Sequence, residues 1–412
     1  MAEERTPLLS NANGYHPTFT QRVANFLKPE GQPGFIKSYK NLFFSSYFNL
    51  LLIFIPLAGV AHFASWDAAI IPLAKLIGES TDAMSNELGQ TLSGLLNASF
   101  GNAIEIIVGI AALLKDEIRI VQTSLLGSIL GNILLVLGSS FLAGGIYGHQ
   151  AEFRTRAAQT YASLLTLGCI TLVIPAAYRS ASLSSNDPLA KLSTYSDKAN
   201  NGLLTISRGT AILLLIVYVT YLSFQLRTHH DLFTPRPNQG SDQVEDAHMN
   251  TFAAGSALLL VTLVTAFVAD WLVDSIEETA ELYHISKPFI GMILIPIVAN
   301  AAEHTTSIWM AIENKYELTM GICVGSSIQI ALFVVPLLVL FRSRTYTVFL
   351  RFRDDHPVCI GYPGQPSNHV RVPHIYSQYP SKKSIRDGRS NYMEGVMLIT
   401  LYLVIALTFW VS

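Results

Sequence analysis

Long apolar stretches separated by shorter polar connectors dominate the chain. A helix needs about 20 apolar residues to cross a bilayer, and most of these stretches approach or exceed that length. In the first half they lie near 47–65, 67–86, 92–113, 121–145, 157–177 and 209–226. In the second half they lie near 253–275, 286–312, 318–341 and 394–411. The pattern predicts an all-α polytopic membrane protein.

Polar segments divide this pattern into domains. Residues 1–45 carry scattered basic residues without the layout of a cleavable signal peptide, so we expect a cytosolic N-terminal arm. The positive-inside bias then fixes the N-terminus on the cytoplasmic side. A polar loop at 227–250 links a first transmembrane half, 46–226, to a second, 251–412.

The segment 342–391 interrupts the second half. It contains nine of the 27 Lys and Arg residues, together with five prolines. Charges and unpaired backbone groups are costly in lipid, so we expect an aberrant polar segment here and no span.

Two polar clusters inside apolar spans repeat at a constant spacing of 198 residues. Asn102, Ala103 and Glu105 align with Asn300, Ala301 and Glu303, and the Gly-Ser pairs at 127–128 and 325–326 align at the same spacing. Duplication of an ancestral half explains such a match. The helix of Glu303 is the fifth after the helix of Glu105 along the chain, an odd number of steps, so the copies run in opposite directions. We therefore predict inverted repeats of about five helices each plus one extra N-terminal helix, with both acidic clusters near the midplane.

Composition narrows the function classes. Half of the residues are hydrophobic and only 14% are charged, against about 25% in soluble domains. The net charge is −2 and no long basic stripe occurs, which argues against a nucleic-acid partner. The three cysteines lie far apart, so we expect free thiols and no disulfide framework.

The two buried glutamates, Glu105 and Glu303, are the strongest candidates for metal binding. A carboxylate at the bilayer centre costs roughly 2.5 kcal/mol or more, which calls for a function. Two facing carboxylates can share Ca²⁺, which binds oxygen ligands. Without the metal, repulsion and burial favour protonation. One site would thus hold Ca²⁺ or protons in turn, with no resident cofactor.

Neutral oxygens near these acids are candidate secondary ligands. Asn102 and Asn300 each lie three residues before a glutamate, hence on the same helix face. Ser128, Ser326 and Gln329 lie on the following helix of each copy. For the serines, interhelical packing is the simpler interpretation.

His304 follows Glu303, whereas Ile106 follows Glu105. An imidazole titrates near neutral pH and could pass the proton, although a membrane histidine can also be a satisfied structural group.

Two charged stripes flank the clusters. They could concentrate cations at the mouths of a pathway or simply be the watery ends of helices, and both interpretations stay open. Their acidic members are Glu79, Asp82, Asp270, Asp274, Glu277 and Glu281.

The motifs GNAIE at 101–105 and NAAEH at 300–304, with the Gly-Ser pairs that follow, resemble the Ca²⁺/H⁺ exchanger branch of the calcium/cation antiporter superfamily. The match covers about 40–341 and returns at 390–395, and the spans look like those of fungal vacuolar members. The resemblance implies eleven helices and transport of Ca²⁺ into an acidic lumen as protons leave. It also implies that Glu105 and Glu303 bind the ion, flanked by Asn102 and Asn300, and that His304 is linked to the proton. Ala299 departs from the family pattern, in which a glycine usually precedes this asparagine.

The resemblance also locates the family's tenth helix within 342–391, where this chain has none. We expect a shifted reading frame or a misplaced splice junction there.

Exchange of Mn²⁺, or of Na⁺ for Ca²⁺, is the nearest alternative function. A more distant alternative is an intramembrane enzyme that uses the paired carboxylates, but no motif such as GxSxG or HExxH accompanies them in this sequence. Another is an inactive structural membrane protein, which would tolerate loss of both acids. Glu4, Leu8 and Leu9 resemble a dileucine signal for a sorting adaptor, consistent with a vacuolar membrane.

Overall fold

The computed structural model describes residues 33–44, 66–148, 150–183, 193–229, 232–233, 250–341 and 389–411. The predicted extra helix at 47–65 and the dileucine pattern lie outside the described residues. So do most of the loop at 227–250 and nearly all of the polar segment at 342–391.

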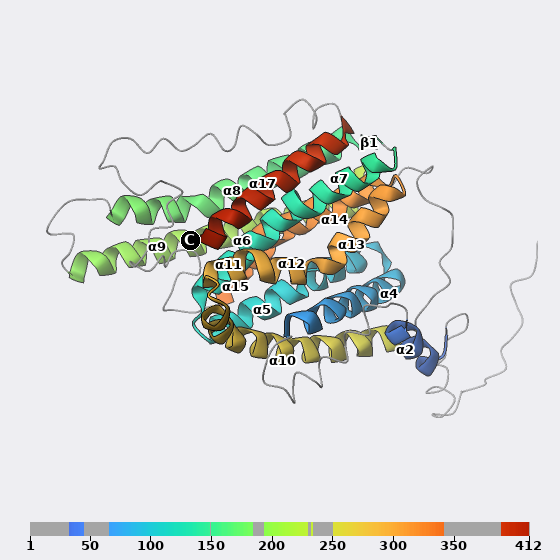
Figure 1. Ribbon diagram of the computed structural model, residues 1–412, viewed down its shortest axis with the longest axis horizontal. Helices are drawn as coiled ribbons and strands as arrows, with labels where there is room; N and C mark the ends of the chain where they lie inside the picture. Colours follow the sequence, from blue (N-terminus) through green and yellow to red (C-terminus); the bar gives the residue numbers. More distant parts are fainter. Residues whose placement is uncertain are drawn as a thin grey trace, which may run out of the picture.

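The described chain is a bundle of helices (Figure 1). The first half contributes α2 (Phe35–Phe44), α4 (Trp66–Phe100), α5 (Ala103–Leu114), α6 (Ile118–Leu130), α7 (Leu137–Ile146), α8 (Thr155–Leu183) and α9 (Ser193–Ser223). The second contributes α10 (Thr251–Tyr283), α11 (Lys287–Phe289), α12 (Ile295–Ala299), α13 (Ala301–Ile312), α14 (Tyr316–Gln329), α15 (Val335–Phe341) and α17 (Tyr392–Val411).

Short π-helical and β segments complete these elements. The π-helical segments Gly131–Val136, Ile290–Leu294 and Ile330–Val334 join α6 to α7, α11 to α12 and α14 to α15, and Phe224–Thr228 extends α9. The strands β1 (Ala151–Glu152) and β2 (Arg389–Ser390) pair antiparallel, with Ala151 opposite Ser390.

Six helices of the described chain are long and apolar enough to cross a membrane, and a seventh span is a pair bent by 55°. The pair is Lys287–Ala299 with Ala301–Ile312. The expectation of an all-α polytopic membrane protein is confirmed. The spans Ile118–Ile146 and Tyr316–Phe341 are 72% and 78% buried, whereas Tyr392–Val411 is 17% buried. The former two therefore form the centre of the bundle.

The two separate spans predicted at 67–86 and 92–113 are wrong in their boundaries. The structure has one helical element, α4, from Trp66 to Phe100, and the chain breaks only at Gly101–Asn102 before α5 begins. The predicted connector at 87–91 contains no proline, so the helical hydrogen bonds continue through it.

Local structure repeats at the spacing seen in the sequence. The helices α5 and α13 each have 12 residues and begin directly after Asn102 and Asn300. Each is followed by a residue in the left-handed region, Asp116 with φ 63° and Asn314 with φ 62°. Both differences are 198 residues, so the duplicated sequence produces duplicated breaks and turns.

The helices α5 and α13 run in opposite directions. The end of α5 leads through Glu117 into the start of the span Ile118–Ile146. The end of α13 lies at the other end of that span, because a Cβ on Gly144 would lie 3.0 Å from the carbonyl of Ala311. This orientation agrees with an inverted arrangement, and the full five-helix repeats stay a prediction.

Candidate ion-binding site

Side chains from both halves of the chain meet at the breaks that precede α5 and α13. The amide nitrogen of Asn102 donates to Oε1 of Gln329, and the Ser326 hydroxyl bonds to Oδ1 of Asn102 at 3.0 Å. Ser326 Oγ also lies 3.2 Å from Oε1 of Glu303. Asn102 is 1% exposed and Ser326 is 7% exposed. The network therefore ties the two halves together within the bundle.

Glu105 completes the acidic pair. Glu105 lies in the first turn of α5 and Glu303 in the first turn of α13. The two carboxylates are close enough to interact electrostatically. The structure thus brings both predicted metal ligands to one place, together with Asn102, Ser326 and Gln329. Ser128 is buried on α6.

Several buried polar atoms at this place have no hydrogen-bond partner among the described residues. They include three oxygens, Oε2 of Glu303, Oδ1 of Asn300 and Oδ1 of Asn132. Buried polar atoms in folded proteins are nearly always paired, so unpaired oxygens next to two carboxylates suit a bound cation. The described chain contains no group of three or more His, Cys, Asp or Glu residues that could hold a metal ion. Neutral oxygens must therefore supply most of any coordination shell, as Ca²⁺ permits.

Asn132 is a site residue that the comparison of the two repeated clusters in the sequence did not find. Its amide donates to the Ser326 hydroxyl at 3.1 Å, and its side chain is 0% exposed. The residue 198 positions later is Ile330, so a search for repeated residues cannot find it. The available signal was its position one turn after Ser128, on the same helix face.

Departures from α-helical geometry position the site. Two π-helical segments, Gly131–Val136 and Ile330–Val334, follow the serines of α6 and α14, and a third precedes Pro296 on α12. Such segments often mark functional sites in helices. Gly127 lies against the Met292 carbonyl and Pro296, where a Cβ would be 2.6 Å from Cγ of the proline. This close approach brings α6 next to α12.

The side chain of His304 contacts α7, whereas that of Glu303 contacts Ser326 on α14. Its Nε2 lies 2.8 Å from the hydroxyl of Ser139 on α7. Ser139 also bonds to the backbone carbonyl of Leu135 at 2.7 Å. The imidazole is therefore held against α7, next to the acidic pair along α13.

Comparison with known proteins identifies the family of the chain. The model of the sodium/calcium exchanger protein family matches residues 58–227 and 254–411. The chain belongs to this family. The vacuolar calcium ion transporter of Schizosaccharomyces pombe is 39% identical over 387 residues, covering 90% of this chain and 86% of that protein. The Ca²⁺/H⁺ antiporter of Aphanothece halophytica is 33% identical over 380 residues, covering 87% and 95% respectively.

Solved structures of exchangers share the architecture. The structure of native YfkE has a TM-score of 0.66 and 29% identity, and the match covers 89% of this chain and all of that one. The crystal structure of the H⁺/Ca²⁺ exchanger CAX has a TM-score of 0.55 at 11% identity, covering 90% and 89%, which shows the fold alone. The resemblance to Ca²⁺/H⁺ exchangers is thereby confirmed at the level of the family.

In this exchanger the charged stripes form ion pairs. Lys115 lies 2.7 Å from Asp270 and 2.8 Å from Asp274. Burial alone would lower the pKa of Lys115, but hydrogen bonds and charge attraction from the two aspartates outweigh it and raise the pKa. The other pairs are Glu79 with Lys75 and Glu277 with Lys287.

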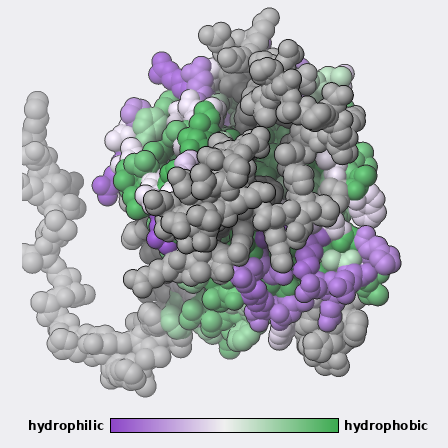
Figure 2. Space-filling view, turned by 90° about the vertical axis from the view of Figure 1, so that its left-hand side faces the viewer, coloured by the Kyte–Doolittle hydropathy of each residue, from purple (hydrophilic) through white to green (hydrophobic). Residues whose placement is uncertain are grey.

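These pairs favour the view that the stripes are charged helix ends. Figure 2 looks onto the end of the bundle where α10 finishes, and hydrophilic side chains gather there beside hydrophobic ones. Asp82 and Glu281 are exposed. The stripes thus differ from the paired acids inside the bundle, because their acids pair with lysines or are exposed.

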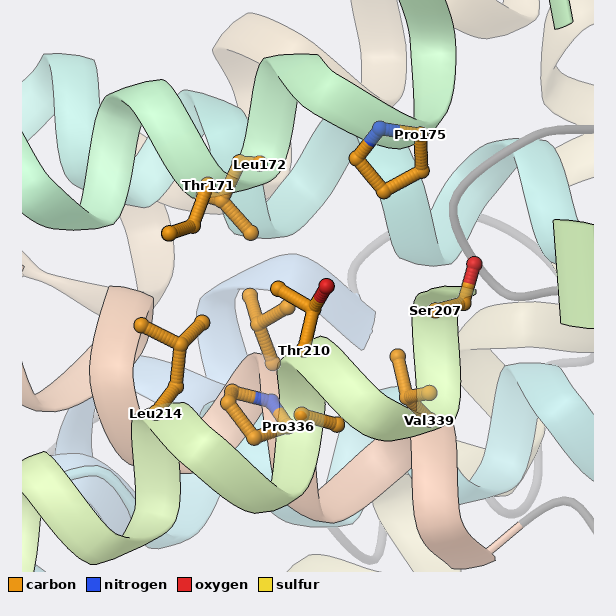
Figure 3. A pocket seen from close by; sticks show the side chains of 10 residues that line it. Thr171, Leu172, Pro175, Ser207, Thr210, Leu214, Pro336 and Val339 are labelled. Carbon is orange, nitrogen blue, oxygen red and sulfur yellow. The ribbon is translucent and has the colours of Figure 1, made fainter. Parts of the chain in front are cut away.

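Two cavities of the described chain lie between helices and differ in how close they come to the acidic pair. The pocket in Figure 3, of about 20 Å³, lies between α8, α9 and α15 and has no charged residue in its lining. A second cavity, of about 60 Å³, lies between α4 and α13 and is lined by Ile71, Lys75, Ala301, Ala302, Thr305 and Thr306. This second cavity adjoins the first turn of α13, which carries Glu303.

Proposed function

We propose that the chain exchanges Ca²⁺ for protons and moves Ca²⁺ into an acidic vacuole while protons leave. The observation that carries this proposal is the set of unpartnered buried oxygens beside Glu105 and Glu303. The names of its relatives agree with it, since they include a vacuolar calcium ion transporter and a Ca²⁺/H⁺ antiporter.

The acidic pair binds either cargo, and each excludes the other. With both carboxylates charged, Ca²⁺ binds between them, and Asn300, Asn132 and Asn102 complete the neutral part of the shell. Protonation of the glutamates removes the charge that holds the metal. Exposure of the site to the two sides in turn then couples the two flows, as in transporters built from inverted repeats.

We also propose roles for residues outside the acidic pair. His304 passes the proton to or from the glutamates with its ring held by Ser139. The N-terminus lies in the cytosol, and Glu4, Leu8 and Leu9 direct the protein to the vacuole through a sorting adaptor. The charged stripes contribute little to attracting cations, because lysines balance several of their acids.

The test is ⁴⁵Ca²⁺ uptake by the purified full chain in liposomes with an acidic interior. We expect uptake that collapses when the pH gradient is dissipated, and that both Glu105→Gln and Glu303→Gln abolish. Glu278→Gln, at an exposed position on α10, is the matched control and should keep normal uptake. Normal uptake by either site variant would contradict the mechanism. Competition with Mn²⁺ and replacement of the pH gradient by a Na⁺ gradient identify the alternative cargoes.

A further inference from the structure

One face of the helix α2 packs against the start of α10. Ser38 and Leu42 lie one turn apart on this face and are 0% and 2% exposed. The backbone amide of Asn250 donates to the Ser38 hydroxyl at 3.0 Å, and the hydroxyls of Tyr39 and Ser256 lie 2.9 Å apart. These contacts fix which side of α2 faces away from the bundle.

The opposite face of α2 carries two large apolar side chains and two lysines. Ile36 and Phe44 are 84% and 81% exposed, and Lys37 and Lys40 are exposed as well. Residues four apart on a helix are neighbours, so Lys40 lies one turn from Ile36 and one turn from Phe44. The face therefore combines positive charge with apolar surface, and removal of that apolar surface from water is favourable.

The positive charge of this face is not balanced within the described part of the chain. Lys115, Lys287 and Lys315 each pair with a carboxylate. By contrast, no ion pair joins Lys37 or Lys40 to another described residue. These two cations are thus available to an anionic partner outside this part of the chain.

The position of α2 indicates what that partner is. The span Thr251–Tyr283 is long and apolar enough to cross a membrane, and α2 lies beside its start at the end of the bundle (Figure 1). The ring centroids of Phe35 and Phe252 are 5.8 Å apart. Along the chain, the apolar stretch near 47–65 begins shortly after α2. A helix held between the starts of two such stretches lies at the level where lipid head groups meet water.

We propose that α2 is an interfacial helix that binds anionic lipid head groups through Lys37 and Lys40 and inserts Ile36 and Phe44 among the acyl chains. Helices that carry basic and large apolar residues lie in the membrane plane in this way. A lysine at this level extends its aliphatic stem along apolar neighbours and keeps its ammonium group at the phosphates. Anionic lipids are typical of the cytosolic leaflet, in agreement with the proposed cytosolic N-terminal arm.

Lipid binding at this place holds the start of α10. Ser38 and Tyr39 connect α2 to Asn250 and Ser256, and Asn250 caps α10 by accepting from the Phe252 amide. An anchored α2 therefore sets the depth of the first turns of this span. The inference does not depend on which ions the chain exchanges.

The experiment places a photoreactive benzophenone amino acid at position 44 of the full chain. Phe44 is exposed, so its replacement leaves the packed face of α2 intact. The protein is reconstituted in vesicles of phosphatidylcholine with a minority of phosphatidylserine and illuminated, and the masses of the lipid adducts identify the head groups.

We expect lipid adducts at position 44 in which phosphatidylserine predominates over its share of the vesicle. The ratio of phosphatidylserine to phosphatidylcholine adducts should exceed the ratio in the vesicle by roughly fivefold, the effect of one lysine near an anionic surface. The double variant Lys37→Gln and Lys40→Gln should keep the adducts and return their ratio to that of the vesicle.

Matched controls locate the effect on α2. The benzophenone in place of Leu263, which is 53% exposed on the α10 span, should give lipid adducts at the vesicle ratio. Lys315→Gln removes a lysine that already pairs with Glu313 and should leave the enrichment at position 44 unchanged. Adducts of position 44 with a peptide of this chain, or no adduct, overturn the interfacial position of α2. Adducts without enrichment, or enrichment that survives the loss of both lysines, overturn the binding of head groups.

Discussion

Asn102 donates a side-chain hydrogen bond to Gln329, although the two residues come from different halves of the chain. Oδ1 of Asn102 also accepts a bond from Ser326. Its counterpart Asn300 is 3% exposed, and neither of its side-chain polar atoms has a partner among the described residues. The two repeated asparagines therefore differ, since Oδ1 of Asn102 already accepts one hydrogen bond that ties the halves together, whereas Oδ1 of Asn300 has its full capacity for an ion.

This difference predicts that Asn300→Ala weakens Ca²⁺ binding directly. We expect the Ca²⁺ concentration for half-maximal uptake to rise roughly 10-fold, which corresponds to about 1.4 kcal/mol. The measurement is ⁴⁵Ca²⁺ uptake against Ca²⁺ concentration at a fixed pH gradient. Asn391→Ala is the control, because Asn391 only caps α17 by accepting from the amides of Met393 and Glu394. An unchanged half-maximal concentration in Asn300→Ala would remove this residue from the shell.

The glycines of the repeated Gly-Ser pairs predict a second asymmetry. Gly127 faces the Met292 carbonyl and Pro296, whereas a Cβ on its counterpart Gly325 would meet nothing within 4 Å. Gly127→Ala should therefore destabilise the protein by about 1–3 kcal/mol through overpacking, and Gly325→Ala should be close to neutral. Thermal unfolding of the detergent-solubilised variants, followed by size-exclusion chromatography, measures both. Equal melting temperatures for the two variants would show that α6 and α12 can separate at no cost.

The spans and the acidic pair could be predicted from the sequence because each depends on a local signal. Apolar length predicts a membrane helix, and Glu105 and Glu303 stand out as charges in apolar surroundings. Asn132 could not be found in this way, since its importance depends on Ser326 from the other half. The break before α5 was misplaced for a related reason: the sequence shows where apolar character pauses, whereas the backbone breaks at Gly101–Asn102.

The charged stripes show the same limit. Their spacing on one helix face could be recognised in Asp270 and Asp274, but their partner Lys115 comes from the connector after α5, 155 residues before Asp270. A pattern along one helix contains no information about which cation lies opposite to it. The cation opposite each acid can therefore be identified only from the three-dimensional arrangement.

The pairing of Lys115 predicts a pH-dependent contribution to stability. Its pKa is raised in the folded protein by Asp270 and Asp274, after the opposing effect of burial. The stabilisation is therefore complete below the unfolded lysine pKa of about 10.4 and is lost as the pH rises through the higher folded pKa. Both aspartates are more than half exposed, at 53% and 65%, so we expect less than about 1 kcal/mol.

The variant Lys115→Met tests this contribution. Its melting temperature should fall slightly below that of the wild type at pH 8, and the gap should close in strongly alkaline buffer, where the wild-type lysine is neutral as well. High salt should narrow the gap at pH 8, because the pair is partly exposed. A gap that persists unchanged at alkaline pH would assign the effect to the packing of the lysine stem.

The direction of α17 predicts an error in the coding sequence between α15 and α17. The span Tyr316–Phe341 begins near Gly144 and so ends at the opposite face of the bundle. The strand before α17 pairs with β1, which follows α7 on the Gly144 side. The end of α17 lies on the other side, where Ser286 donates to the Phe409 carbonyl. The end of α15 and the start of β2 therefore lie at opposite faces of the bundle.

The sequence of that connection is unsuited to a crossing, because its charges and prolines are spread along its whole length. We expect the transcript to encode an apolar helix of about 20 residues there, which restores the missing crossing. Sequencing cDNA across the junction, and comparing uptake by chains with the present and the corrected segment, decides between them. An uninterrupted cDNA that encodes Arg351 to Lys383 as written, from a chain with full uptake, would contradict the expectation. The last helix would then have to enter the membrane from the face where α15 ends.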